Sequence, residues 1–427
     1  MRDFEEEIIL TKALIVALDT GENTDFEHSV EELKSLAEAA GKQVVGVITQ
    51  RMPAANKAYY IGAGKVSEVK AYAAATEAEE IIFDDSLTPS QIRNLGNELE
   101  LPVMDRTNLI LDIFALRAKT GEAKLQVETA RLQYMLPRLV GMRENLSRQG
   151  GTGGSMSNKG AGETKLELDR RKIEHRISEL GRELKEIAEN RTTQRAQRER
   201  SGIPEVVLVG YTNAGKSTIL NKLVEKYGEN KEKTVLEKDM LFATLDTRVR
   251  TIKTGDNKPF FLADTVGFID KLPHNLVKAF RSTLEEVKYA DLLVQVVDYS
   301  DPHFKQHMEV TAETLRELGV EAIPQLIVYN KSDRCEVSPL PKLGNDCIYM
   351  AAAPEIGLEE LILLIKDRIY AQYREATFLV PYDQGRVTSY LQENATVYAT
   401  EYLPEGVRLR VHCSGKDVNR YREYLLE

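Results

Sequence analysis

The stretch from Gly210 to Thr218 holds side chains that could bind and cleave a nucleotide phosphate. It fits the pattern G-x-x-x-x-G-K-[ST] and follows the short apolar run Glu205–Val209. Backbone N–H groups in such a loop converge on a phosphate, and the next helix adds positive potential from its N-terminus. Lys216 would neutralise the β- and γ-phosphates, and the Ser217 hydroxyl would coordinate magnesium. The predicted phosphate loop consists of Gly210, Tyr211, Thr212, Asn213, Ala214, Gly215, Lys216, Ser217 and Thr218.

A second motif, D-x-x-G, follows the loop in the order that a nucleotide domain requires. The apolar residues 260–263 predict a strand that runs into Asp264, Thr265, Val266 and Gly267. In this motif Asp264 would hold magnesium through water, and the Gly267 N–H would contact the γ-phosphate. Between the two motifs lie Phe242, Ala243, Thr244, Leu245 and Asp246. A threonine at this place can complete the magnesium shell, so Thr244 is a candidate ligand beside Ser217 and Asp264.

A third motif, N-K-x-D, is expected to select the base. It follows the predicted strand 325–329 and consists of Asn330, Lys331, Ser332 and Asp333. The Asp333 carboxylate can accept hydrogen bonds from N1–H and the 2-amino group of guanine, whereas adenine offers neither in that arrangement. Asn330 would orient the loop, and Lys331 would pack along the ring. Three motifs in this order, each after a predicted strand, predict a site for guanine nucleotides.

The residue after D-x-x-G bears on hydrolysis. Many GTPases have glutamine there, but this chain has Phe268, which cannot orient the attacking water. Hydrolysis by the protein alone is therefore expected to be slow. The predicted catalytic residues are Lys216, Gly267 and Asn213, the last as a ligand for a potassium ion placed where an arginine finger would act. A partner macromolecule is the alternative source of stimulation.

The composition is that of a globular protein with two to four domains. The chain has 427 residues, is 42% hydrophobic and 29% charged, and carries a net charge of -10. A chain this acidic could contact RNA only through a local basic surface. Its three cysteines, Cys335, Cys347 and Cys413, have no metal-ligand spacing and are expected to be free thiols in a reducing compartment. Without a signal peptide or an apolar run of membrane length, we expect a cytoplasmic protein, with peripheral membrane contact left open. A monomer is expected as well.

Four domains are predicted along the chain, in a multidomain α/β fold. Residues 1–120 alternate strand and helix, which favours a parallel sheet. Residues 121–200 contain two long helices that predict a hairpin or coiled-coil arm with a glycine-rich tip at about 146–162. Residues 201–371 form the P-loop GTPase domain, a mixed sheet flanked by helices. Residues 372–427 form a small α+β domain that ends in a helix predicted over 417–425.

Two other features of the first domain have unremarkable interpretations. Gly62–Lys65 resembles a phosphate loop but lacks the full spacing, so a turn that opens a helix is favoured. The pair Asp84 and Asp85 at a strand end could bind a cation, but loop and helix-capping roles are favoured.

The predicted arm carries a local excess of positive charge. From Arg138 to Arg200 there are fifteen Lys and Arg against ten Asp and Glu. A glycine-rich tip between basic helices suits contact with folded RNA, while a solvated spacer with a flexible turn, from Arg148 to Gly162, explains the same residues. Local physics does not separate these two interpretations. The candidate RNA-contacting residues are Arg148, Lys159, Lys165, Arg170 and Arg171.

Several further stretches, most of them upstream of the phosphate loop, form a characteristic set. They are Tyr60–Lys65, Asp105–Thr107, Leu109–Phe114, Leu125–Glu128, Leu136–Leu139 and Gly162–Arg171, with Phe242–Asp246 and Asp264–Phe268 in the nucleotide domain. Through these residues the chain resembles, over nearly its whole length, the HflX family of ribosome-associated GTPases. Two positions depart from the family pattern: Thr247 replaces a proline, and Ala351, Ala352 and Ala353 replace a Ser-Ala-x loop whose backbone N–H reaches guanine O6.

The resemblance implies a magnesium-dependent GTPase that binds GTP and GDP and docks on the large ribosomal subunit. The glycine-rich tip would reach ribosomal RNA near the peptidyl-transferase centre, and GTP-dependent binding would split or rescue stalled ribosomes under heat or antibiotic stress. Subunits would stimulate hydrolysis. A ribosome-assembly or RNA-modification GTPase is the first alternative. An ATP-driven RNA remodelling enzyme and a membrane-associated signalling GTPase are the others.

Overall fold

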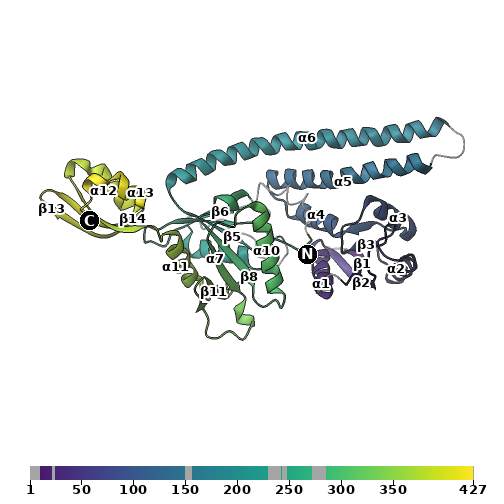
Figure 1. Cartoon of the computed structure of the whole chain (residues 1–427), viewed down its shortest axis with the longest axis horizontal. Coiled ribbons are helices and arrows are strands. Elements are labelled where there is room, and N and C mark those ends of the chain that lie inside the picture. The colour runs from purple at the N-terminus through teal and green to yellow at the C-terminus, as the bar shows by residue number, and fades with distance from the viewer. Residues whose placement is uncertain are drawn as a thin grey trace, which may run out of the picture. The chain divides into compact units, whose positions relative to one another are not determined.

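The computed structural model describes residues 10–21, 25–149, 156–228, 242, 248–271 and 285–426 (Figure 1). The chain divides into two compact units, one built mainly from residues up to 193 and the other mainly from residues from 194 onward. In the described part, no helix has the length and apolar character to cross a membrane.

The first unit begins with a four-stranded parallel sheet in the order β2-β1-β3-β4. Leu14, Val16 and Phe83 point to one face and pack with Val69 of α2 and Leu95 of α3. This alternation of strand and helix confirms the α/β fold predicted for the segment. Its elements are β1 (Thr11–Asp19), α1 (Phe26–Ala39), β2 (Lys42–Arg51), α2 (Ala63–Thr76), β3 (Glu80–Phe83), α3 (Pro89–Leu99), β4 (Val103–Asp105) and α4 (Arg106–Arg117).

Gly62 to Lys65 open a helix, as favoured from the sequence, because Gly62 is the N-cap of α2. Asp84 and Asp85 do not cap α3. That helix is capped by Thr88, whose side chain accepts from the backbone N–H of Gln91. Asp84 instead accepts from Ser29 Oγ at 2.7 Å and pairs with the buried Arg106 guanidinium at 3.0 Å. The ion pair with the Arg106 guanidinium therefore accounts for the Asp84 carboxylate better than a capping role does.

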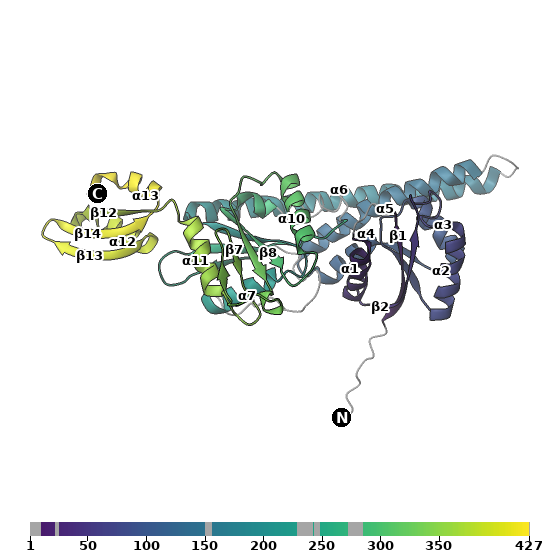
Figure 2. The ribbon, with the colours of Figure 1, turned by 60° about the horizontal axis from the view of Figure 1, so that its bottom comes forward.

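Two long helices follow, α5 (Gly121–Gln149) and α6 (Met156–Ser201), and they lie side by side in Figures 1 and 2. Arg176 of α6 pairs with Glu128 of α5 at 2.7 Å, and Arg191 pairs with Glu122 at the same distance. Because the partner number falls as the α6 number rises, the helices are antiparallel. The glycine-rich connection is shorter than predicted from Arg148 to Gly162, since helix continues through Gln149 and resumes at Met156.

The second unit contains a seven-stranded sheet in the order β10-β11-β9-β8-β5-β7-β6. The strands from β11 to β7 are parallel, while the edge strands β10 and β6 are antiparallel to their neighbours, so the sheet is mixed as predicted. Helices α7 and α11 cover one face through residues such as Leu220 and Leu361. The elements are β5 (Glu205–Val209), α7 (Lys216–Tyr227), β6 (Arg248–Ile252), β7 (Phe260–Asp264), β8 (Leu292–Asp298), α10 (Phe304–Leu318), β9 (Gln325–Asn330), β10 (Lys342–Leu343), β11 (Cys347–Tyr349) and α11 (Leu358–Ile369).

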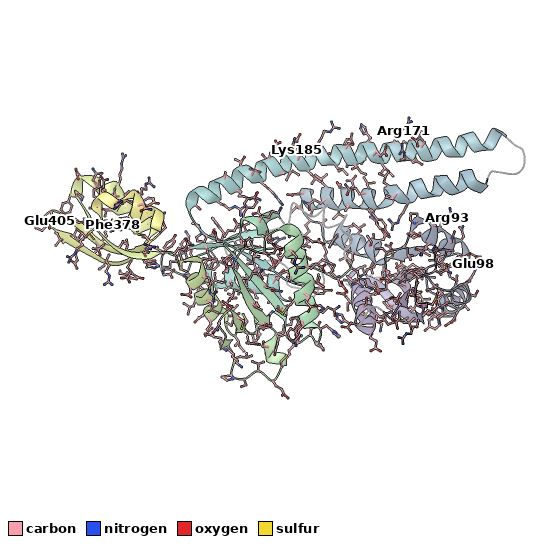
Figure 3. The ribbon with its side chains drawn as sticks, in the orientation of Figure 1. Arg93, Glu98, Arg171, Lys185, Phe378 and Glu405 are labelled. Carbon is pink, nitrogen blue, oxygen red and sulfur yellow. The ribbon has the colours of Figure 1, made fainter. Side chains whose placement is uncertain are left out.

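The chain ends in a three-stranded antiparallel sheet in the order β12-β14-β13, which includes the predicted hairpin. Its core contains Phe378, labelled in Figure 3, with Leu391 and Leu409. The final helix is shorter than the predicted 417–425, because α13 ends at Arg420 and a 3-10 turn follows at Arg422–Tyr424. The elements are β12 (Arg374–Val380), α12 (Gly385–Asn394), β13 (Thr396–Leu403), β14 (Gly406–Cys413) and α13 (Gly415–Arg420). All three cysteines are free, as predicted.

Candidate functional site

The candidate site lies where the central strands of the seven-stranded sheet end. β5 runs between β7 and β8, parallel to both, and β9 is the next strand beyond β8. The loop after β5, Asp264 at the end of β7 and Asn330 at the end of β9 therefore share one edge of the sheet. Ligands of open α/β sheets bind at this edge, outside the carboxyl ends of the strands.

The loop after β5 needs glycine at two places. Gly210 has φ 141°, and a Cβ there would stand 2.2 Å from the Val296 carbonyl oxygen of β8. Gly215 has φ 97°, and a Cβ there would stand 2.2 Å from Asn330 Nδ2. Asn213 also has positive φ, at 58°, which asparagine tolerates better than most residues. Any side chain at either glycine would therefore push the loop off its neighbouring strands.

Lys216 is the buried cation of the site. Its Nζ donates to the loop's own carbonyl oxygens, at 2.9 Å to Gly210 and 2.7 Å to Tyr211. Burial lowers the pKa of Lys216 to about 8, although Asp264 acts in the opposite direction. A bound phosphate would add negative charge beside the ammonium and raise this pKa again.

The two predicted magnesium ligands that the structure describes are in contact. Ser217 Oγ donates to Asp264 Oδ2 at 2.7 Å, and the Asp264 side chain is buried. A hydroxyl and a carboxylate are the oxygen ligands that Mg²⁺ prefers, and Mg²⁺ in such sites also binds substrate phosphates. These residues therefore fit the ion. Thr244 lies outside the described residues, with Ala243, Leu245 and Asp246. Phe242 packs edge-on against Phe114 of α4, with ring centroids 4.6 Å apart.

The D-x-x-G motif lies directly against the phosphate loop. A Cβ at Gly267 would stand 2.8 Å from Thr212 Cα and 3.1 Å from Lys216 Nζ. Thr265 faces the sheet instead, where its hydroxyl donates to the Leu208 carbonyl oxygen at 2.8 Å. Val266 is buried. The Gly267 backbone thus lies close to the lysine.

Asn330 connects three loops of the site. Its Nδ2 donates to the Ala214 carbonyl oxygen at 2.9 Å, and its Oδ1 accepts from the Ala352 N–H at 2.9 Å. Ser332 fixes the same motif through bonds to the Tyr329 and Met350 carbonyl oxygens. Lys331 has φ 58° and its Nζ pairs with Asp298 at 2.8 Å. The Asp333 side chain is exposed, so it is open to a base.

In the alanine loop after β11, two of the three backbone N–H groups donate hydrogen bonds within the protein. The Ala351 N–H donates to the Ile356 carbonyl oxygen, and the Ala352 N–H donates to Asn330. Both alanines are buried, whereas Ala353 is exposed. Of the three, Ala353 is left as the candidate for contact with guanine O6, and this role stays a prediction.

One contact of the phosphate loop was not predicted from the sequence. The Tyr211 ring stacks on His307 of α10, with centroids 3.9 Å apart and planes at 9°. No local pattern links these residues, because α10 was not predicted to approach the loop. The only hint in the sequence was an aromatic residue, Tyr211, inside the phosphate loop.

The candidate RNA-contacting residues are described only in part. Arg170 and Arg171 of α6 both pair with Glu167, at 3.1 and 3.2 Å, and Figure 3 marks Arg171 on the helix. Glu167 is held below its usual pKa by these guanidinium groups, first by its hydrogen bond to Arg170. The side chains of Arg148, Lys159 and Lys165 lie outside the described part, so their roles stay predictions.

Comparison with known proteins gives the family. Three family models match in succession: "GTP-binding GTPase N-terminal" over residues 27–115, "GTP-binding GTPase Middle Region" over 117–198 and "50S ribosome-binding GTPase" over 205–331. The GTPase HflX of Caldanaerobacter subterraneus is 42% identical over 97% of this chain and 94% of its own length. The chain belongs to the HflX GTPase family. Those of Alkalihalophilus pseudofirmus and Escherichia coli are 41% and 38% identical over 94% and 88% of this chain, and over 93% and 87% of their own lengths.

Membership in the HflX family confirms the predicted activity. This chain binds guanine nucleotides and hydrolyses GTP. Among solved structures, a complex of the protein SsGBP with GDP is 27% identical, with a TM-score of 0.44, over 85% of this chain and 98% of that one. The family assignment rests on the sequence relatives.

Proposed function

We propose that this HflX-family GTPase binds the large ribosomal subunit through its N-terminal half and splits or rescues stalled ribosomes under heat or antibiotic stress. The family model over residues 205–331 carries the description "50S ribosome-binding GTPase", which supports a ribosomal partner. The predicted nucleotide contacts, with Lys216 on the phosphates and Asp333 on the base, belong to this proposal. So does Mg²⁺, held by Ser217 and Asp264 and supplying charge neutralisation at the phosphates.

The observation that carries the proposal is the joint between α6 and the nucleotide fold. α6 ends at Ser201 and β5 begins at Glu205, so the arm helix runs almost directly into the strand that bears the phosphate loop. Arg198 pairs with Glu205 of β5 at 3.1 Å and with Glu286 at 3.2 Å, and Arg195 also pairs with Glu286 at 3.2 Å. These four side chains form the joint cluster.

The joint cluster is largely buried, which makes it a defined contact rather than a loose surface pairing. Glu286 lies in the 3-10 turn Glu285–Tyr289, and the Arg195 guanidinium stacks 3.8 Å over the Tyr289 ring. Burial raises the pKa of Glu205, while Arg198 and Arg195 hold the pKa of Glu286 below its usual value against burial. Breaking such a cluster leaves uncompensated buried charge, so the end of α6 and the turn at Glu286 are expected to move together.

The charge of the arm favours contact near its tip. Between Arg138 and Leu166 there are five Lys and Arg against two Asp and Glu, whereas acidic and basic residues balance from Glu167 to Arg191. Arg195 and Arg198, at the other end of α6, are bound within the joint cluster. The positive charge available to RNA phosphates is therefore concentrated around the glycine-rich connection.

The function is tested by splitting of purified ribosomes, followed by light scattering, with a non-hydrolysable GTP analogue. The wild type is expected to lower the scattering. A deletion of residues 150–162, which keeps the rest of the N-terminal half, is expected to leave binding to the large subunit but abolish splitting. Co-sedimentation with assembly intermediates, and not with mature subunits, would replace this function with the assembly role.

In the absence of ribosomes, a potassium ion bound at Asn213 is proposed to support the residual GTP hydrolysis. Asn213 has an exposed side chain on the phosphate loop, and its amide oxygen is a hard ligand of the type that alkali cations bind. Turnover is expected to fall when sodium replaces potassium and to become insensitive to this exchange in Asn213→Ala. Equal rates in the two salts would remove potassium from the mechanism.

A further inference from the structure

Tyr211 occupies a buried position between the phosphate loop and the residues that follow the D-x-x-G motif. Tyr211 is 6% exposed, and His307, on which its ring stacks, is 8% exposed. His307 Nδ1 also lies 3.8 Å from the carboxylate of Asp301, which precedes α10. The ring of Tyr211 is therefore held from one side by a helix that carries none of the three nucleotide motifs.

On its other side, the Tyr211 side chain is hydrogen-bonded to the backbone after the D-x-x-G motif. The Asp270 N–H donates to Tyr211 Oη at 2.8 Å. Two main-chain bonds lie beside it: Thr212 N–H donates to the Phe268 carbonyl oxygen at 2.8 Å, and Phe268 N–H donates to the Gly210 carbonyl oxygen at 3.1 Å. Three hydrogen bonds thus join residues 268–270 to the phosphate loop, and the Tyr211 hydroxyl makes the outermost one.

These hydrogen bonds also fix the position of Gly267, the residue just before Phe268. Gly267 precedes Phe268 and lies so close to the loop that a Cβ would meet Thr212 Cα at 2.8 Å and Lys216 Nζ at 3.1 Å. Its N–H is the group predicted to meet the γ-phosphate. A donor in a fixed place stabilises developing charge because it does not have to reorganise during the reaction.

A fixed Gly267 N–H is more important in this chain because of the residue that follows it. Phe268 offers no hydrogen-bonding side chain, and it is buried. The chain cannot use this residue to orient water, so backbone groups near the γ-phosphate must carry more of the catalysis. Their placement then depends on whatever holds residues 267–270 in register with the loop.

We propose that Tyr211 is a positioning residue for GTP hydrolysis: its hydroxyl holds Asp270, and thereby the Gly267 amide, in register with the phosphate loop, while His307 fixes the Tyr211 ring. Tyr211 acts through backbone and does not touch the reacting atoms. The Tyr211 side chain is not among the groups predicted to bind the nucleotide, so the rate of the chemical step should depend on this side chain more than the affinity does.

Four variants test the proposal in the full chain. Tyr211→Phe removes the hydroxyl and keeps the stacked ring. His307→Ala removes the stack, and His307→Phe restores an aromatic partner. Tyr370→Phe is the matched control, because Tyr370 is a buried tyrosine of the same unit whose hydroxyl donates to a backbone carbonyl oxygen, that of Pro259. For each variant the single-turnover rate of GTP hydrolysis, the Kd for GDP and the thermal midpoint are measured.

Tyr211→Phe is expected to lower the single-turnover rate about 5-fold, the loss typical of one hydrogen bond, with the Kd for GDP changed less than about 2-fold. His307→Ala should be slowed similarly, and His307→Phe should recover most of the rate. Tyr370→Phe should hydrolyse GTP at the wild-type rate even if its thermal midpoint falls. A wild-type rate in Tyr211→Phe, or a loss of GDP affinity with an unchanged rate, would overturn the proposal. A His307→Phe variant as slow as His307→Ala would remove His307 from it.

Discussion

Asn330 Nδ2 donates to the Ala214 carbonyl oxygen at 2.9 Å, so the base-selecting motif and the phosphate loop are joined by one side chain. The same amide accepts from Ala352 through Oδ1. Asn330 is 2% exposed, and its amide lies where a Cβ on Gly215 would have to stand. The two halves of a nucleotide, base and phosphates, would therefore be bound by loops that share a buried link.

Replacing Asn330 with alanine is expected to weaken GTP and GDP equally. The change leaves the Ala214 carbonyl oxygen and the Ala352 N–H without this partner, at a cost of about 1–3 kcal/mol for each buried group. Affinity should fall at least about 10-fold for both nucleotides, as measured by titration of fluorescent GDP and GTP analogues. A loss confined to GTP would show that Asn330 acts on the γ-phosphate side and not as a link between loops.

Replacing Asp333 with asparagine is expected to change which base binds. A carboxylate accepts from N1–H and the 2-amino group of guanine, whereas an amide presents one donor and one acceptor and suits xanthine, which has an oxygen at position 2. Affinity for GDP should fall at least about 100-fold and affinity for XDP should rise. Competition titrations with the two nucleotides measure both changes. If the variant keeps its guanine affinity, Asp333 does not read the base.

The burial of Lys216 predicts a pH dependence of nucleotide binding. Its pKa of about 8 lies below the ordinary 10.5, so above pH 8 the folded protein has lost this proton before nucleotide binds. The phosphates need the ammonium, so binding takes up a proton and affinity falls as the pH rises through 8. The Kd for GDP is expected to be about 10-fold larger at pH 9 than at pH 7.

Isothermal titration in buffers of different ionisation enthalpy checks this proton uptake. Guanosine, which has no phosphate for Lys216 to meet, should bind without the same uptake and serves as the control. A Kd for GDP that is flat between pH 7 and pH 9 would contradict the lowered pKa.

The joint cluster predicts a variant that separates ribosome binding from stimulation. Glu286→Gln keeps the shape of the side chain but removes the charge that Arg195 and Arg198 share. Co-sedimentation with large subunits should persist, while stimulation of GTP turnover should fall at least about 5-fold. Glu313→Gln, on the exposed face of α10, is the matched control and should be stimulated normally. Full stimulation of Glu286→Gln would show that the cluster serves stability alone.

The sequence predicts those parts of the fold that local chemistry determines. β5 was predicted with its observed bounds, since apolar residues fill the strand after Glu205. The glycine-rich connection was predicted too long, because helix extends into it from both sides. The edge strand β6 was missed. It contains two arginines, Arg248 and Arg250, among its five residues and depends on pairing with β7.

The site was predictable to a similar depth. Residues within a motif, such as Lys216 and Asp264, could be named from spacing alone. The contacts that join motifs could not be, because Asn330 reaches Ala214 and Tyr211 reaches His307 only after the sheet has formed. Sequence periodicity has no information on pairs so far apart, and the two arginines of the joint cluster were likewise missed.

GTP turnover with and without purified large ribosomal subunits tests the central claim most directly. The account predicts slow turnover by the protein alone, a marked rise with subunits, and co-sedimentation that requires GTP or a non-hydrolysable analogue. Unchanged turnover together with no co-sedimentation would contradict a ribosome-coupled switch. It would leave a GTPase whose arm serves another partner.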